Sequence, residues 1–420
     1  MIYRIIHCAD LHLDSPLRGL SASADAPVEA LRTASRRAFE NLIDLAIAES
    51  VAVVLIAGDI FDGDWKDWHT GQFFARGLAR LAAAGVRVVA ISGNHDAASE
   101  ISRKLESAWP EQARLLDHKK PQSVHFHDLA LSIHGRSFPT RAVYDNIALD
   151  YPRPREGHLN IGLLHTALDG GDGHEPYAPC TLPQLRDFGY DYWALGHVHV
   201  RAERSQNPWI VFPGNLQARH INEAGEKGAT LITVEDRRII SVTHVPLDVL
   251  RWQRITVDVS TCADADAVEA TWLAAIRAAA AAAGDRMLAA RGRIHGASPA
   301  HAELAANPAA MQDRLRNVAL AALTEGALWL ERIELDTTPP TGPAPPDPDA
   351  EPLLHLLTAL PADPAIAQLA AWARELLNKA PGLRDTLADD HPAIALDRGD
   401  MPESLLAQAH ALLRARLAGG

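Results

Sequence analysis

Residues 51–62 read VAVVLIAGDIFD, and this stretch decides how the first half of the chain folds. Seven apolar residues, most of them β-branched, are followed at once by glycine and aspartate. A run that is apolar on both alternating faces is typical of a strand buried on both sides in a sheet. Gly58 and Asp59 end the run, so we expect the Asp59 carboxylate to lie at the carboxyl end of a buried strand.

Short apolar runs of the same kind recur through the first 200 residues. They predict strands over residues 3–8, 51–57, 86–91, 160–164 and 191–195. Residues 27–50 and 66–84 have the apolar spacing of helices, and strand–helix alternation indicates a sheet with helices packed on it. Beyond residue 124 the pattern becomes all-β, with a hairpin over 124–135 and strands over 209–212, 229–234 and 239–245. We therefore expect two sheets within one α/β domain, over residues 1–248.

The rest of the chain divides into three further segments. Residues 249–336 predict a small β-α-β-α-β unit, with its elements at residues 252–259, 265–283, 287–295, 300–323 and 328–335. Residues 337–352 (TTPPTGPAPPDPDAEP) predict a stiff Pro-rich linker. Residues 353–420 are helical by pattern, and their apolar stripes must be covered by the parent chain or by another protein.

Composition narrows the class of protein. Three scattered cysteines are no disulfide framework, and the chain shows neither a signal peptide nor an apolar run long enough for a bilayer, so we expect a cytoplasmic protein without a membrane anchor. The net charge of −13 leaves nucleic acid open as a partner without favouring it. Fourteen of the 20 histidines precede residue 221, which favours metal or acid–base chemistry there.

Five short motifs follow one another, each at the end of a predicted strand. They are Asp10-Leu11-His12, Gly58-Asp59-Ile60-Phe61-Asp62, Gly93-Asn94-His95-Asp96, His165 in GLLHT, and Gly196-His197-Val198-His199. Strand ends in α/β sheets bring side chains from distant segments to one ligand. Each motif taken alone is more often a turn or a structural histidine, but the joint, ordered occurrence at strand ends predicts a site.

The residue types in these motifs suit a pair of divalent metal ions. Carboxylate, amide and imidazole ligands without cysteine favour Mn²⁺, with Fe²⁺ or Zn²⁺ as alternatives. Asp59 is our candidate for a bridge between the two ions. Paired metals need a protonated group for the leaving oxygen, and His95 is the candidate donor, with the Asp62 carboxylate holding its ring.

Other polar residues are not included in the predicted site. We predict that four histidines inside the predicted strands are structural, namely His7, His125, His127 and His134. Asp14, Asp96 and His220 are left undecided between a structural and a functional role.

The ordered set DLH…GDIFD…GNHD…LLHT…GHVH resembles that of calcineurin-like metallophosphoesterases. The flanking stretches IIHCADLHLDSPLRGL and PGNLQARHINEAGEKG resemble the SbcD-type DNA repair nucleases and, within them, the YhaO-like branch. The resemblance implies an α/β/β/α sandwich of two sheets, a small α+β capping domain over 249–336 and a helical C-terminal segment.

The resemblance also implies how the ligands divide. Asp10, His12, Asp59 and His199 would hold one ion, while Asp59, Asn94, His165 and His197 would hold the other. His95 would be the catalytic acid. Asp62 fits phosphatase and bacterial nuclease relatives, whereas archaeal and eukaryotic break-repair nucleases have histidine there.

The expectation that follows is a metal-dependent DNA exonuclease that works with an SbcC-like coiled-coil ATPase. The acidic C-terminal segment is the candidate docking element, and a homodimer is left open. Two alternatives remain: a phosphodiesterase or phosphatase for small molecules or phosphoproteins, and a scaffold subunit whose activity is incidental. The complete set of seven metal-ligand residues, with Asp59 counted for both ions, argues against the scaffold.

Overall fold

The structure is a computed structural model that describes residues 1–15, 26–62, 68–97, 108–170, 175–340, 364–379, 391–398 and 405. The chain forms two compact units. The first comprises Met1–Gln253, Ala283–Ala290 and Gly326–Glu331, and the second comprises Arg254–Ala282, Arg291–Glu325 and Arg332–Gly420.

The first unit contains a six-stranded sheet in which four strands run parallel. Its spatial order is β12 (Arg238–Pro246), β11 (Gly228–Glu235), β1 (Ile2–Cys8), β2 (Val53–Ala57), β3 (Arg87–Ile91) and β4 (Ala113–Leu115). The strands from β1 to β4 are parallel, while β11 and β12 are antiparallel additions. All five residues of β2 are buried, as its unbroken apolar sequence predicts for a central strand.

A second six-stranded sheet follows in the same unit. Its order is β5 (Gln122–Phe126), β6 (Leu131–Gly135), β7 (Leu159–His165), β8 (Tyr192–Gly196), β10 (Trp209–Phe212) and β9 (Ala202–Gln206). The four central strands are parallel, and both edge strands are antiparallel. β5 and β6 form the predicted hairpin.

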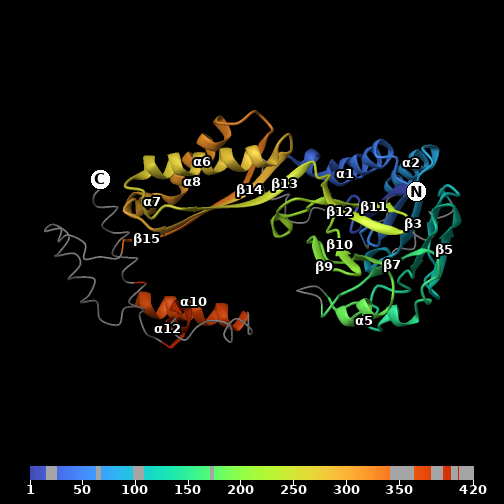
Figure 1. Ribbon diagram of the computed structural model, residues 1–420. Helices are drawn as coiled ribbons and strands as arrows, with labels where there is room; N and C mark the ends of the chain where they lie inside the picture. The colour runs from blue at the N-terminus through green and yellow to red at the C-terminus, as the bar shows by residue number, and fades with distance from the viewer. Residues whose placement is uncertain are drawn as a thin grey trace. The chain divides into compact units, whose positions relative to one another are not determined.

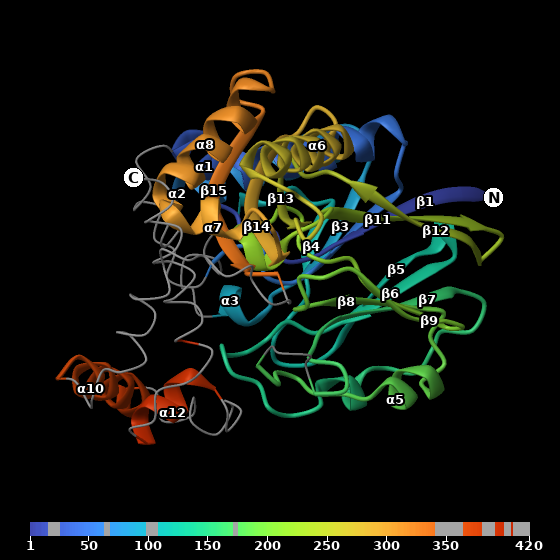
Figure 2. The same cartoon turned by 90° about the vertical axis from the view of Figure 1, so that its left-hand side faces the viewer.

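The two sheets pack face to face with helices on the outside. The core between them is built of apolar residues from both sheets, among them Ile5, Leu55, Val89, Ile133, Ile161 and Tyr192. Helices α1 (Val28–Ala48) and α2 (Trp68–Ala83) cover the outer face of the first sheet, and α5 (Leu182–Asp187) covers that of the second (Figures 1 and 2). This is the predicted α/β/β/α sandwich.

A three-stranded sheet follows, in the order β13 (Leu250–Asp258), β14 (Met287–Ala297), β15 (Leu328–Thr338). In the second unit, α6 (Ala265–Ala283) packs on this sheet. The Trp272 ring of α6 lies so close to Gly292 of β14 that an added Cβ would be 2.5 Å from it. The Trp272 indole also donates to the Leu315 carbonyl at 3.0 Å, which joins α6 to α8 (Pro308–Ala321). The predicted β-α-β-α-β order is therefore observed.

Two details differ from the sequence-based expectation. The predicted helix over 300–323 is two helices, α7 (His301–Ala306) and α8 (Pro308–Ala321). The break falls where Asn307 accepts from the Ala310 backbone N–H and Pro308 takes the first helical position, a strong helix-start signal. In addition, β15 runs through Thr338, two residues into the predicted linker, because Ser298 donates its backbone N–H to the Thr338 carbonyl.

Two helices are described in the C-terminal region, α10 (Pro364–Lys379) and α12 (Pro392–Arg398). They are joined by an ion pair between Arg374 and Asp397, and Leu377 and Leu396 are buried. Leu353, Leu356, Leu357 and Leu360, whose helical spacing the sequence indicates, lie outside the described residues. No helix in the described ranges has both the length and the apolarity to cross a membrane.

Candidate metal centre

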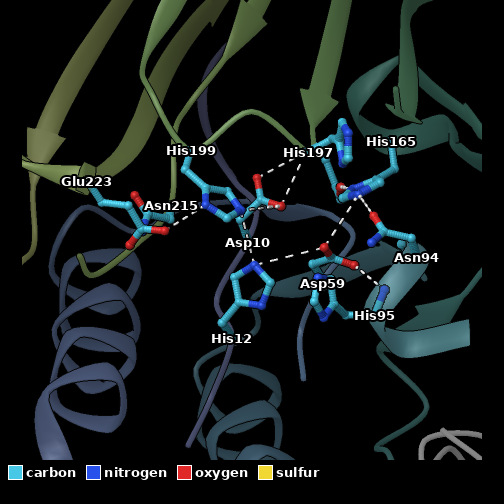
Figure 3. A network of polar contacts seen from close by, with 12 residues as sticks. Asp10, His12, Asp59, Asn94, His95, His165, His197, His199, Asn215 and Glu223 are labelled. Carbon is cyan, nitrogen blue, oxygen red and sulfur yellow. Dashed lines mark hydrogen bonds and ion pairs between the residues drawn. The ribbon is translucent and has the colours of Figure 1, made fainter. Parts of the chain in front are cut away.

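All nine residues predicted for the site lie together at the carboxyl ends of strands from both sheets. Asp10 and His12 follow β1, Asp59 and Asp62 follow β2, and Asn94 and His95 open the short helix α3 (Asn94–Ala97) behind β3. His165 ends β7, and His197 and His199 follow β8. Figure 3 shows eight of these side chains, with Asp62 not labelled, around a common centre. The two sheets thus place ligands from five segments in one site.

The backbone at four of these positions has an unusual conformation. Asp10, His12, Asp59 and His197 have positive φ angles of 52°, 41°, 52° and 100°. Such a conformation costs a non-glycine residue about 1–3 kcal/mol and persists only where the surroundings impose it. Here the Asp10 and His12 amides donate to the carbonyls of Gly58 and Asp59, at 3.0 and 3.1 Å. Strain concentrated at these four residues indicates a functional site.

Two glycines allow the strand ends to approach closely enough. A Cβ at Gly196 would lie 1.9 Å from the Ala57 carbonyl oxygen, and one at Gly93 would lie 2.3 Å from Asp59 Oδ1. Any side chain at either position would push a ligand-bearing loop away. The glycines in GHVH and GNHD therefore have a packing reason that the motifs alone do not reveal.

The first group of ligand atoms belongs to Asp10, His12 and His199, which lie within 4.8 Å of one another. His199 Nδ1 donates to Glu223 Oε1 at 2.8 Å, so its Nε2 carries a lone pair, and this atom lies 3.2 Å from His12 Nε2. His12 Nδ1 is buried without a hydrogen-bond partner among the described residues. If His12 carries its proton on Nδ1, its Nε2 lone pair faces the lone pair of His199 Nε2, and a cation between the two rings would bind both nitrogens.

The second group contains Asp59, His165 and Asn94. His165 Nδ1 donates to the Ala57 carbonyl at 2.8 Å, which directs its Nε2 lone pair at Asn94 Oδ1, 3.0 Å away. Asp59 Oδ2 lies 3.6 Å from this nitrogen and 3.9 Å from His12 Nε2. One oxygen of Asp59 thus lies between the two groups, where a bridging ligand is needed.

His197 completes the second group from the other side. Its ring lies 5.1 Å from the His165 ring, and its Nε2 contacts the Glu175 carbonyl at 2.9 Å. The contact fixes Nε2 as the protonated nitrogen and leaves the lone pair on Nδ1. Metal-binding histidines commonly donate their second ring N–H to a carbonyl or carboxylate in this way.

Electrostatics at the centre fit bound cations. Burial, then the neighbouring Asp59 charge, raises the pKa of Asp10. Burial lowers the pKa of His12 and of His165, which keeps both rings neutral. Two buried carboxylates beside neutral imidazoles form an electron-rich cavity, and the oxygen and nitrogen donors match divalent transition ions. The residues present therefore fit the metal pair that the sequence predicts.

His95 and Asp62 form a separate pair beside the ligands. His95 Nδ1 donates to Asp62 Oδ1 at 2.6 Å, and Ser15 Oγ donates to the other carboxylate oxygen. Burial alone would lower the pKa of His95, but the Asp62 hydrogen bond together with the Asp59 and Asp62 charges raises the pKa above its usual value. Burial alone would raise the pKa of Asp62, but the hydrogen bonds from His95 and Ser15 lower it. An imidazole with a raised pKa, 29% exposed, thus lies at the rim of the centre.

Glu223 is a residue of the site that the sequence motifs do not predict. This carboxylate is 6% exposed and accepts from His199 Nδ1, from Asn215 Nδ2 at 2.9 Å and from the Arg219 backbone and guanidinium (Figure 3). It fixes which nitrogen of His199 faces the centre. Glu223 lies in the 213–228 stretch that carries the family resemblance, but at no strand end, so the strand-end pattern could not select it.

Two undecided aspartates support the loops. Asp96 accepts the backbone N–H groups of Ile60, Phe61 and Gly93, which ties the loop after β2 to the loop after β3. Its pKa is raised to about 7 by burial and by the Asp59 charge. Asp14 instead pairs with Arg36. The third undecided residue, His220, is 53% exposed and lies 3.7 Å from Glu223.

The four histidines predicted to be structural lie outside the centre. His7 is buried and contacts the Tyr192 hydroxyl, and His134 contacts Ser123 and Asn160. His125 lies on β5, but His127 opens a 3₁₀ turn and is therefore not in a strand.

The chain was compared with known proteins. Residues 3–201 match the family described as calcineurin-like phosphoesterase, and residues 252–338 match the middle domain of metallophosphoesterase YhaO. YhaO of Bacillus subtilis (strain 168), itself uncharacterized, is 37% identical over 259 residues, which is 61% of this chain and 63% of YhaO.

Two nuclease relatives are more distant. The DNA double-strand break repair protein Mre11 of Methanopyrus kandleri is 30% identical over 54% of this chain and 51% of its own length. A subunit of the nuclease SbcCD from Staphylococcus epidermidis is 21% identical over 59% of this chain and 70% of its own. The chain thus spans about half to two thirds of the relatives it matches. Residues 3–201 of this chain therefore carry the match to a calcineurin-like phosphoesterase domain, and they contain all nine residues predicted for the site.

Proposed function

We propose that this protein hydrolyses phosphodiester bonds of DNA with two bound divalent ions, as an exonuclease. The observation that carries the proposal is the convergence of the seven proposed ligand side chains with the hydrogen-bonded His95–Asp62 pair at their rim. The likeness to a DNA break-repair protein and to a nuclease subunit supports DNA as the substrate. The chemistry by itself serves any phosphodiester.

The proposed ligands divide between the two ions. Asp10, His12 and His199 hold one, Asn94, His165 and His197 hold the other, and Asp59 bridges them. Mn²⁺ is the proposed ion, because carboxylate, amide and imidazole donors without thiolate suit it. When bound, such a pair activates water and neutralises phosphate oxygens.

The chain's own acid is His95. Because its Nδ1 donates to Asp62, the proton that it can give to the leaving oxygen is the one on Nε2. Asp62 fixes the ring orientation and stabilises the charged imidazolium, so the donor is protonated before substrate arrives. Asp62 is also tied to the loop after β1 by the Ser15 hydroxyl, which limits movement of the pair.

The test is hydrolysis of end-labelled DNA by the purified protein with Mn²⁺, comparing the wild type with Asp59→Ala. Asp145→Ala, at an exposed carboxylate, is the control. We expect stepwise loss of nucleotides that only Asp59→Ala abolishes. The protein could instead hydrolyse a bis-aryl phosphodiester but cleave neither single-stranded nor double-stranded DNA. That result would favour a phosphodiesterase or phosphatase for small molecules or phosphoproteins.

A partner and a location complete the proposal. We propose that the protein acts in the cytoplasm with an SbcC-like coiled-coil ATPase, which would supply the grip on DNA that an acidic chain lacks. The name of the nuclease subunit that it resembles supports a multi-subunit enzyme. Co-purification of such an ATPase with the tagged full-length protein tests the assembly.

A further inference from the structure

An arginine beside the ligand cluster has no part in the steps above. Arg219 lies just before the 3₁₀ turn Ile221–Glu223, and its side chain is 18% exposed. Its Nη2 lies 3.2 Å from His199 Nδ1 and donates to Glu223 Oε1 at 2.7 Å. Since His199 Nδ1 already donates to the same carboxylate, Arg219 and His199 share Glu223 as acceptor.

Glu223 holds only one edge of the guanidinium. Arg219 Nε and Nη2 both donate to the carboxylate, and the Arg219 backbone N–H donates to it at 2.8 Å. Arginine has five N–H donors in a rigid fork. The two on Nη1 make no hydrogen bond to any residue within the described ranges. The fork is thus fixed along one edge and open along the other.

The charge of Arg219 acts on the centre itself. After burial, it is the next largest cause that lowers the pKa of His12, and it also opposes the raised pKa of His95. In return, Glu223, Asp62 and Asp10 raise the pKa of Arg219. The guanidinium therefore lies within electrostatic reach of both a metal ligand and the acid.

A fixed cation at this place works against metal binding. Like charges a few ångströms apart repel, and less water inside the cavity strengthens the repulsion. Glu223 does not need the guanidinium as its donor, because His199, Asn215 and a backbone N–H already donate to it. An anionic substrate would gain from a second cation here, and arginine is the side chain best suited to phosphate oxygens.

We propose that Arg219 binds a non-bridging oxygen of the substrate phosphate through Nη1, and that Glu223 orients the guanidinium for this contact. The inference rests on the proposed function insofar as the substrate is a phosphodiester. It deepens that function by naming the residue that recognises the phosphate. It does not depend on whether the diester belongs to DNA.

The experiment compares Arg219→Gln and Arg219→Lys with Arg201→Gln. Arg201 is a matched control, because it is 21% exposed and pairs with Glu203 and Thr230 away from the ligands. Binding of inorganic phosphate to the Mn²⁺-loaded protein is measured by calorimetry, the ion content by elemental analysis, and KM and kcat with a bis-aryl phosphodiester.

For Arg219→Gln we expect phosphate affinity to fall about 10- to 100-fold, the span of one charge-assisted hydrogen bond, and KM to rise in parallel. Metal affinity should stay equal or increase, because a repelling cation is gone. Arg219→Lys should fall between, since lysine keeps the charge and loses the fork. Arg201→Gln should match the wild type.

Two results would overturn the inference. One is unchanged phosphate affinity in both Arg219 variants. The other is a weakened metal site with phosphate affinity falling only in proportion, because Arg219 would then merely hold Glu223 and His199. If Arg219→Gln does not fold, the lysine variant decides the same question. Failure of the wild type to cleave DNA would contradict the proposed substrate but leave the phosphate measurements standing.

Discussion

At the scale of single residues, the His95–Asp62 pair gives the sharpest test of the chemistry. His95→Ala is expected to keep both ions, because no ligand atom is removed, and to lower turnover of a diester with a poor leaving group by about 10²–10⁴-fold. Asp62→Asn should act in the same direction but less strongly, since the imidazole remains. Steady-state kinetics and elemental analysis on the same preparations check both statements.

A suitable control is His118→Ala, because His118 is 43% exposed and pairs with Asp117, which is not a proposed ligand. Loss of metal from His95→Ala would show that His95 is a ligand. Full activity of that variant on a poor leaving group would place the proton donor elsewhere.

The number of ions is a second prediction at this scale. Asp59 Oδ2 lies between His12 Nε2 and His165 Nε2, so one carboxylate can serve both sites. Elemental analysis after saturation with Mn²⁺ should give about two ions per chain, as a two-metal phosphoesterase mechanism requires. Asp59→Ala should weaken the binding of both ions, because the variant lacks the bridging carboxylate. A wild-type value that stays at one or below would exclude the paired-metal mechanism.

Glu223 is predicted to control metal affinity through His199. Glu223→Gln keeps the side-chain size but removes the carboxylate that accepts from His199 Nδ1 and fixes the His199 tautomer. Such outer partners typically change metal affinity about 10- to 100-fold, so the Mn²⁺ titration of the variant should shift to higher concentration. Glu226→Gln is the control, because Glu226 is 56% exposed and pairs with Arg251. Equal titration curves for the wild type and Glu223→Gln would contradict the prediction.

The sequence could predict which side chains lie together at the strand ends, but not the residues that support them. Asp10, Asp59 and His165 follow apolar strands, and residues at strand ends share one edge of a sheet. Glu223 and Arg219 reach the centre from a loop whose course depends on tertiary contacts, so no local periodicity selects them. The positive φ angles at Asp10 and His197 are likewise imposed by neighbouring loops and cannot be derived from composition.

At the scale of elements, strong apolar patterns were reliable and polar ones were not. The β2 run is buried along its whole length, and α1 buries residues at helical spacing, including Leu31, Ala38 and Leu42. Strands β4 and β9 were not predicted. β4 has only three residues, which is too short for a pattern. β9 is a polar edge strand with the sequence AERSQ, and it forms because it pairs with β10 rather than because of its own strand propensity.

The break between α7 and α8 gives an element-scale prediction. The Asn307 side chain accepts from the Ala310 amide at 3.2 Å and satisfies a donor that the helix start leaves open. Asn307→Ala should lower the free energy of unfolding by about 1 kcal/mol, whereas Asn307→Asp, which retains a capping oxygen, should leave it nearly unchanged. Urea unfolding followed by circular dichroism measures the difference. Equal destabilisation by both variants would mean that the cap is not the cause.

At the scale of the whole molecule, the proposed chemistry and the other roles fall in different regions of the chain. Every proposed ligand precedes residue 200, and the 252–338 region matches a separate family description. The sequence indicated these regions through changes of pattern. The role of the C-terminal segment is harder to predict from the sequence. An apolar helical stripe indicates that another surface covers it, but does not indicate which surface.

The last prediction concerns residues 353–420 as a docking module for the ATPase. In α10, Ala373 and Leu377 are buried while Trp372 is 59% exposed, and a large exposed aromatic side chain is a typical interface anchor. The segment carries more acidic than basic residues, which makes it a poor surface for DNA. Because β15 ends at Thr338, the informative truncation ends at Pro340.

We expect the truncated protein to remain folded, to bind its two ions and to cleave a bis-aryl diester, but not to co-purify with the ATPase. Trp372→Ser in the full chain should weaken the same association, while Tyr144→Ser, at an aromatic residue 65% exposed on the phosphoesterase domain, should not. Misfolding of the truncated protein would show that the segment serves the fold of its own chain. Undiminished ATPase binding would place the interface elsewhere, because a module that can be removed without loss of the complex cannot be what holds it.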